Sequence, residues 1–178
     1  MQHFMWILGM VIAGAAAYSD WRFRRIPNRL TVSAFLLGLT LNSVAWGWHG
    51  TRNSLIGAAI PMLALLPLVM MRGLGAGDWK LMVALGSILG WAEILLVLLA
   101  SVFVAGMIAF VQVIRQRRAK EALANMWGVL RVFAVFGIIP NGEISLDNPN
   151  AATLPFGVAA AAATVMCYLG LLAVTKWS

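Results

Sequence analysis

The sequence has few of the side chains that form disulfides or bind metal ions. Its single cysteine, Cys167, lies inside an apolar run, so neither an intrachain disulfide nor a thiolate zinc cluster is possible. The two histidines, His3 and His49, are far apart and have no partner at metal-ligand spacing. We therefore expect no metal ion and no cofactor.

Charged residues are also scarce. They make up 11% of the 178 residues, against about 25% in an ordinary soluble domain. Hydrophobic residues make up 62%, and the mean hydropathy is +0.88. These values are typical of an integral membrane protein, so we predict an all-α, polytopic chain that forms a single membrane-embedded domain over residues 1–178.

The positive charges stand between the apolar runs rather than together. The net charge is +7, but the cations form no cluster with interleaved aromatic residues of the kind that binds nucleic acid. We expect the lipid bilayer, and no nucleic acid, as a partner. The chain also lacks the Lys/Arg-rich start of a secretory signal, which predicts a retained first helix with its N-terminus outside.

About six membrane-spanning helices are expected. They are predicted over residues 4–19, 30–48, 54–71, 78–89, 91–114 and 153–174, separated by glycine, proline or charged turns. The apolar segment 122–139 contains Arg131, which is costly in lipid at mid-span, so an interfacial or partly embedded helix is favoured there over a full crossing.

The charge distribution predicts the orientation of this topology. Of the 13 Lys and Arg residues, only Arg52 and Lys176 fall on one side, which leaves 13 − 2 = 11 on the other. Cytoplasmic loops carry such an excess of positive charge. The bias places Asp20 and Asp78 at the cytoplasmic ends of their helices.

Asp20 and Asp78 stand out among only six acidic residues, because the other four fall in polar segments or at an outer helix end. A structural role is one interpretation. Asp78 would then be the N-cap of its helix, Gly75 and Gly77 would serve only the turn, and Asp20 would pair with a neighbouring arginine.

A catalytic role is the other interpretation. Asp20 lies near a helix C-terminus, where the macrodipole disfavours a negative charge, whereas Asp78 lies at a helix N-terminus, which favours one. Two carboxyl groups with such different surroundings suit acid/base chemistry. On this hypothesis Asp78 is the general base that activates water, and Asp20 is the general acid.

Two stretches carry a resemblance to a known family. Residues 20–28, Asp-Trp-Arg-Phe-Arg-Arg-Ile-Pro-Asn, resemble the first signature of the type IV prepilin peptidases, especially the short Tad/Cpa-type members. Residues 75–81, Gly-Ala-Gly-Asp-Trp-Lys-Leu, resemble the second signature, the G-x-G-D motif with its following lysine. Residues 154–157, Leu-Pro-Phe-Gly, look like the Pro-aromatic start of the family's last helix.

The resemblance implies a GxGD intramembrane-type aspartic endopeptidase. It would cleave the leader of pilin-like (Tad/Flp-type) precursors at the cytoplasmic face of the inner membrane. Asp20 and Asp78 would be the catalytic pair, brought together by a loop that Gly75 and Gly77 make possible. Lys80 would shape the site, although a snorkelling or topology role for it is equally open.

Pro27 and Asn28 complete the first signature in this comparison. Larger members of the family also methylate the new N-terminus and carry a cytoplasmic region with paired cysteines. This chain has no C-x-x-C, so methyltransferase activity is not expected.

Two further functions remain open at this stage. One is a non-catalytic membrane subunit, either a transporter or a secretion-system scaffold, although a transporter would place ionisable groups near the bilayer midplane. The other is an archaeal preflagellin peptidase, which differs only in substrate and host.

Overall fold

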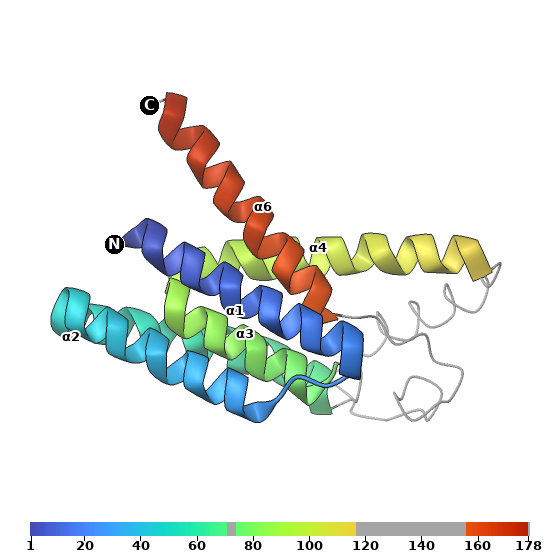
Figure 1. Ribbon diagram of the computed structural model, residues 1–178, viewed down its shortest axis with the longest axis horizontal. Coiled ribbons are helices and arrows are strands. Elements are labelled where there is room, and N and C mark those ends of the chain that lie inside the picture. The colour runs from blue at the N-terminus through green and yellow to red at the C-terminus, as the bar shows by residue number, and fades with distance from the viewer. Residues whose placement is uncertain (71–73, 117–155, 178) are drawn as a thin grey trace.

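All elements that the structure assigns are α-helices (Figure 1). It is a computed structural model that describes residues 1–70, 74–116 and 156–177. The helices are α1 (Gln2–Phe23), α2 (Asn28–Met70), α3 (Ala76–Leu89), α4 (Trp91–Gln116) and α6 (Phe156–Trp177). The all-α polytopic fold is thus confirmed, whereas the helix predicted over 122–139 lies outside the described residues.

The number of membrane spans differs from the six that were expected. Four helices are long and apolar enough to cross a membrane, namely α1, α2, residues 91–111 of α4 and residues 156–174 of α6. The element α2 covers both of the helices that were expected, at 30–48 and 54–71. The chain reverses direction within it at Gly47, whose φ of 59° and ψ of −138° break the helix into two arms (Figure 1). The helix α3 has 14 residues, too few to count as a candidate span.

The helix α3 lies between the two arms of α2, close enough for backbones to touch. A Cβ atom on Gly38 of the first arm would lie 2.7 Å from the backbone nitrogen of Ile88. On the second arm, a Cβ atom on Gly57 would overlap the carbonyl oxygen of Gly86. Small residues permit such close packing of membrane helices, and the residues of α3 from Leu81 onward, apart from Val83, are accordingly buried.

Buried polar side chains hold α3 in register with α2. The Asn42 amide nitrogen donates to the carbonyl oxygens of Ser87 and Ile88, at 3.0 and 3.1 Å. The Ser54 hydroxyl donates to the same Ser87 carbonyl from the other arm, at 2.6 Å. These bonds satisfy polar groups that are fully or nearly fully buried, so a shift of α3 along its axis that broke them would be costly.

The helices α1, α4 and α6 pack around this unit through small residues. Ala13 and Ala16 of α1, in a run of small residues at 13–17, are fully buried. On α6, Ala159, Ala160 and Ala163 are fully buried too. The helix α6 contacts both α1 and α4, and it starts beside the C-terminal end of α1 (Figure 1).

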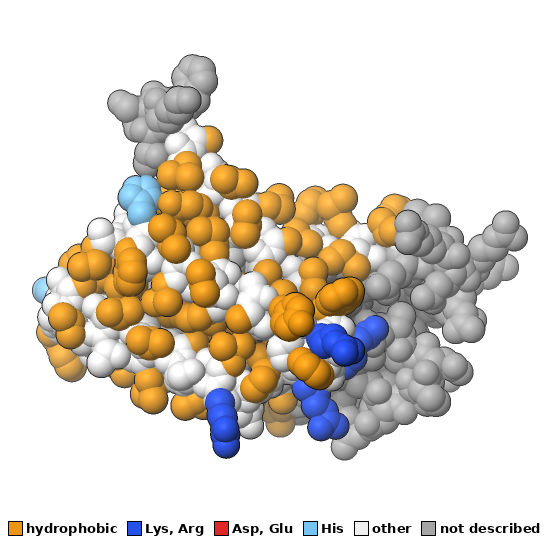
Figure 2. Space-filling view, in the orientation of Figure 1, with side chains coloured by type: hydrophobic (Ala, Val, Ile, Leu, Met, Phe, Trp, Pro, Cys, Tyr) orange, Lys and Arg blue, Asp and Glu red, His pale blue; other side chains and the backbone are white. Residues whose placement is uncertain are grey.

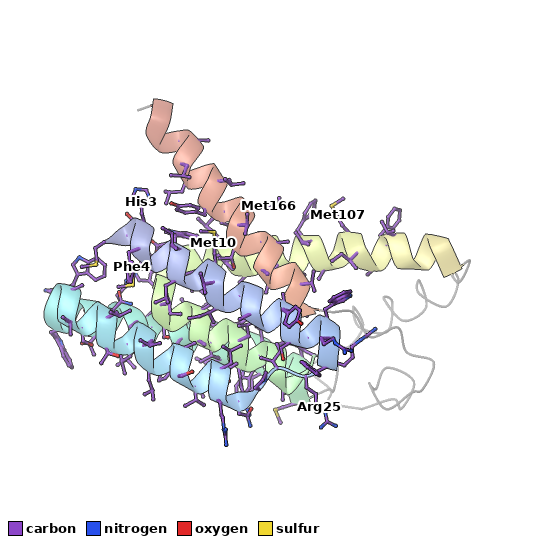
Figure 3. All side chains as sticks on the ribbon, in the orientation of Figure 1. His3, Phe4, Met10, Arg25, Met107 and Met166 are labelled. Atoms are coloured by element: carbon purple, nitrogen blue, oxygen red, sulfur yellow. The ribbon has the colours of Figure 1, made fainter. Side chains whose placement is uncertain are left out.

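The outer surface is apolar except at one end. Hydrophobic side chains cover most of the face drawn in Figure 2, and Lys and Arg gather toward the end where α1 finishes and α2 begins. Arg25 marks this end in Figure 3, while His3 and Phe4 lie at the opposite end. The basic end of the bundle is thus the end that contains the connection between α1 and α2.

The glycine contact between α2 and α3 generates a stability prediction. Gly57→Ala places a methyl group against the Gly86 carbonyl and forces the helices apart, so we expect it to lower the free energy of unfolding by about 1–3 kcal/mol. Gly106→Ala is the matched control, since a Cβ there meets no atom within 4 Å. Thermal unfolding in detergent measures both. Equal melting temperatures for the two variants would contradict the close packing.

Candidate active site

Asp20 lies in the last turn of α1, within the helix rather than beyond its end. The helix continues to Phe23 and ends at Arg24, which adopts the left-handed conformation with φ 52° and ψ 29°. The Arg24 backbone N–H donates to the Asp20 carbonyl oxygen at 2.8 Å. This bond and the helix fix the backbone of Asp20, and its side chain is half-buried.

Asp78 is the third residue of α3, so the interpretation of Asp78 as the N-cap of this helix is wrong. The helix starts at Ala76, its N-cap is Gly75, and the N-cap residue makes no side-chain cap hydrogen bond. The Oδ1 atom of Asp78 is buried and has no hydrogen-bond partner among the described residues. A buried carboxyl oxygen without a donor disfavours the ionised form.

A single backbone amide brings the two aspartates together. The N–H of Gly157, at the start of α6, hydrogen-bonds to the carboxyl groups of both Asp20 and Asp78. The charge of Asp20 also acts on Asp78, and a Cβ atom built on Gly157 would lie 3.2 Å from Oδ2 of Asp20. The structure thus places the two predicted site residues side by side.

The protonation expected for Asp78 is also wrong. Burial raises the pKa of Asp78 to about 7, and the negative charge of Asp20 acts in the same direction. The Gly157 N–H lowers this pKa but does not outweigh burial. A helix N-terminus does favour a carboxylate, but here desolvation dominates, because neighbouring helices enclose the start of α3.

Gly75 and Gly77 provide space rather than an unusual backbone. Neither has a positive φ, so the turn does not require glycine for its conformation. A Cβ on Gly75 would lie 3.0 Å from the Asp78 carboxyl, and a Cβ on Gly77 would lie 3.2 Å from the Cβ of Ile26. The glycines therefore leave room for the carboxyl group and for the segment that joins α1 to α2.

Lys80 connects the two sequence signatures. Its ammonium group donates to the Asn28 side-chain oxygen at 3.0 Å. Asn28 is the first residue of α2, and the preceding Pro27 accepts a bond from the Leu30 N–H at 3.0 Å. Lys80 therefore makes a specific contact, in addition to the snorkelling or topology role considered for it. Pro27 and Asn28 lie where α3 meets the start of α2.

Gly157 is the residue of this arrangement to which sequence reasoning gave no role. The stretch 154–157 was noted only as a typical helix start. No local pattern indicates that its amide meets residues about 80 and 140 positions earlier. Within the described residues, no three His, Cys, Asp or Glu side chains are grouped so as to hold a metal ion.

A comparison with protein-family models identifies the family. The model described as the type IV leader peptidase family matches residues 7–110, which is more than half of the 178 residues. The chain belongs to the type IV leader peptidase family. No curated protein and no solved structure matches it.

The family match supports a leader-peptidase-like function for this protein. The matched range contains both aspartates, both glycines of the G-x-G-D stretch and Lys80, whereas Gly157 lies outside it. In this member of the leader peptidase family, Asp20 and Asp78 thus lie within the matched range, whereas the Gly157 N–H that acts on both comes from α6, outside it.

The contact between the carboxyl groups generates a titration prediction. Asp20→Asn removes a negative charge beside Asp78 while keeping the shape of the side chain, so the pKa of Asp78 falls below about 7. Infrared difference spectroscopy of the protonated carboxyl band follows this titration. The band is assigned to Asp78 if it is absent in Asp78→Asn. Glu93→Gln, on α4, is the control that leaves the titration in place. An unchanged pKa in Asp20→Asn would contradict the proximity.

Proposed function

We propose that this protein is an aspartic endopeptidase that removes the leader peptide from pilin-like precursors, with Asp20 and Asp78 as its catalytic pair. The observation that carries the proposal is the single Gly157 N–H bonded to both carboxyl groups. Two carboxyl groups this close rarely ionise together, so one proton is shared between them. A singly protonated pair is the form that can act as base and acid in the same step.

The proposal reverses the roles first assigned from the sequence. Asp78 has the buried oxygen and a pKa of about 7, so it holds the proton and serves as the general acid. Asp20 is then the ionised member and serves as the general base. Because the pair titrates as a unit, the proton moves between the two groups during turnover.

The proposed reaction is hydrolysis of one peptide bond. Asp20 takes a proton from a water molecule, whose oxygen attacks the scissile carbonyl carbon, while Asp78 gives its proton to the carbonyl oxygen. This forms a neutral tetrahedral diol. Asp20, now protonated, then gives its proton to the leaving nitrogen and Asp78 takes one from a diol hydroxyl. The C–N bond breaks, and the pair returns to its starting state.

We further propose a Tad/Flp-type precursor as the substrate and the cytoplasmic face of the inner membrane as the place of cleavage. Support comes from the position of Asp20, which lies at the same end of the bundle as Arg25 and the other basic residues between α1 and α2 (Figures 2 and 3). Cytoplasmic loops are the ones rich in such residues. Residues 1–178 act as one membrane-embedded domain in this proposal, without methyltransferase activity.

Removal of either carboxyl group tests the catalytic pair. Asp20→Asn and Asp78→Asn keep shape but cannot exchange the proton, so we expect each to reduce cleavage of a co-expressed pilin-like precursor by about 10²–10⁴-fold. Immunoblotting of precursor and product gives the extent of cleavage, and membrane fractionation confirms equal amounts of enzyme. Glu93→Gln should cleave like the unmodified protein. Normal processing by both aspartate variants would end the proposal.

The pH dependence of cleavage tests the division of roles. If Asp78 is the acid, its deprotonation above a pKa of about 7 removes the active form, so kcat declines as the pH is raised through this value. The measurement is single-turnover cleavage of a precursor in detergent across a pH series. A rate that instead rises through pH 7 would show that Asp78 acts as the base.

A further inference from the structure

The start of α6 lies directly against Asp20. Gly157 is buried, and a Cβ atom built on it would lie 3.2 Å from Oδ2 of Asp20 and 3.3 Å from its Cβ. Such distances are shorter than ordinary van der Waals contacts, so any side chain at position 157 would displace the carboxyl group. The backbone of Gly157 has no positive φ, so glycine is favoured at this position by the space that Asp20 occupies and not by the backbone conformation.

The amide at this position differs from a side-chain donor in two ways. A backbone N–H on a packed helix neither titrates at neutral pH nor rotates, and backbone N–H groups in the first turn of a helix have no partner within it. Fully buried alanines at 159, 160 and 163 hold the first turns of α6 in the bundle. The donor is thus fixed in place relative to the two carboxyl groups.

We propose that Gly157 is a positioning residue of the active site: its N–H holds the carboxyl groups of Asp20 and Asp78 side by side, and its missing side chain makes room for Asp20. The proposal rests on the proposed function and deepens it. Without a shared donor, repulsion between two carboxyl groups favours their separation whenever both ionise. One N–H between them stabilises the pair while it carries a single negative charge.

The interactions described for two cationic side chains of this region are of another kind. Arg24, at the end of α1, acts on Asp20 through its charge. Lys80, on α3, donates to Asn28. Among the contacts described for both carboxyl groups, Gly157 is the hydrogen-bond donor they have in common.

Enzyme kinetics give the first test. Gly157→Ala pushes the pair apart, and misplacement of catalytic groups by a fraction of an ångström to 1 Å costs about 10–100-fold in rate. We expect kcat to fall by this factor with KM unchanged. The descending limb of the pH profile should also shift, because both the bond from the N–H, which lowers the pKa of Asp78, and the charge of Asp20, which raises it, become weaker. Gly170→Ala is the matched control on the same helix, where a Cβ meets no atom within 4 Å.

Nuclear magnetic resonance gives a second test that needs no catalysis. In protein labelled with ¹⁵N-glycine, the Gly157 amide is assigned as the signal lost in Gly157→Ala. Its chemical shift should titrate with the carboxyl pair in the intact protein. In Asp20→Asn or Asp78→Asn the shift should move at neutral pH and should follow the titration of the one remaining carboxyl group. The Gly170 amide should stay unchanged in all of these samples.

The outcomes separate this inference from the proposed function. Wild-type kcat and an unshifted pH profile in Gly157→Ala, with both aspartates still required, would overturn the positioning role alone. A Gly157 amide signal that ignores both aspartate substitutions would also overturn it. Normal cleavage by both aspartate variants would instead overturn the proposed function, whatever the behaviour of Gly157.

Discussion

The backbone contact between α3 and the two arms of α2 is the constraint on which the site depends. Glycines at 38, 57 and 86 allow the helix backbones to approach closely at this contact, and Asn42 and Ser54 bond to the backbone of α3 across it. The position of α3 along its axis is thereby set near its C-terminal end. Because a helix is stiff over 14 residues, the same contacts also set the position of Asp78 along the axis of α3, at the N-terminal end of this helix.

Burial and repulsion then determine the chemistry of the two carboxyl groups. Asp78 is enclosed where α3 meets α1 and α6, and the charge of Asp20 lies beside it. Both effects favour a proton on Asp78, whereas the N-terminal position in α3 and the Gly157 N–H favour its loss. The result is a pKa of about 7, which leaves the pair able to exchange one proton near neutral pH.

The sequence allowed the all-α class and the meeting of Asp20 with Asp78 to be predicted, because hydropathy, charge placement and two short signatures are local patterns. It did not allow the role of the glycines to be predicted. Gly75 and Gly77 suggested only a flexible turn, whereas they make room for the Asp78 carboxyl and for Ile26. The ionised form predicted for Asp78 is disfavoured for a similar reason. Helix position is visible in a sequence, but the burial that outweighs it arises from helices that are distant along the chain.

The position of α6 beside α1 has a consequence for biosynthesis. The three groups that meet at the site come from residues 20, 78 and 157, in the first, third and last of the described helices. A nascent chain that has inserted α1 to α4 already contains both carboxyl groups, but it lacks the amide that holds them together. The site is thus completed only when the last described helix enters the bundle, so a partly synthesised chain in the membrane is not yet an assembled protease.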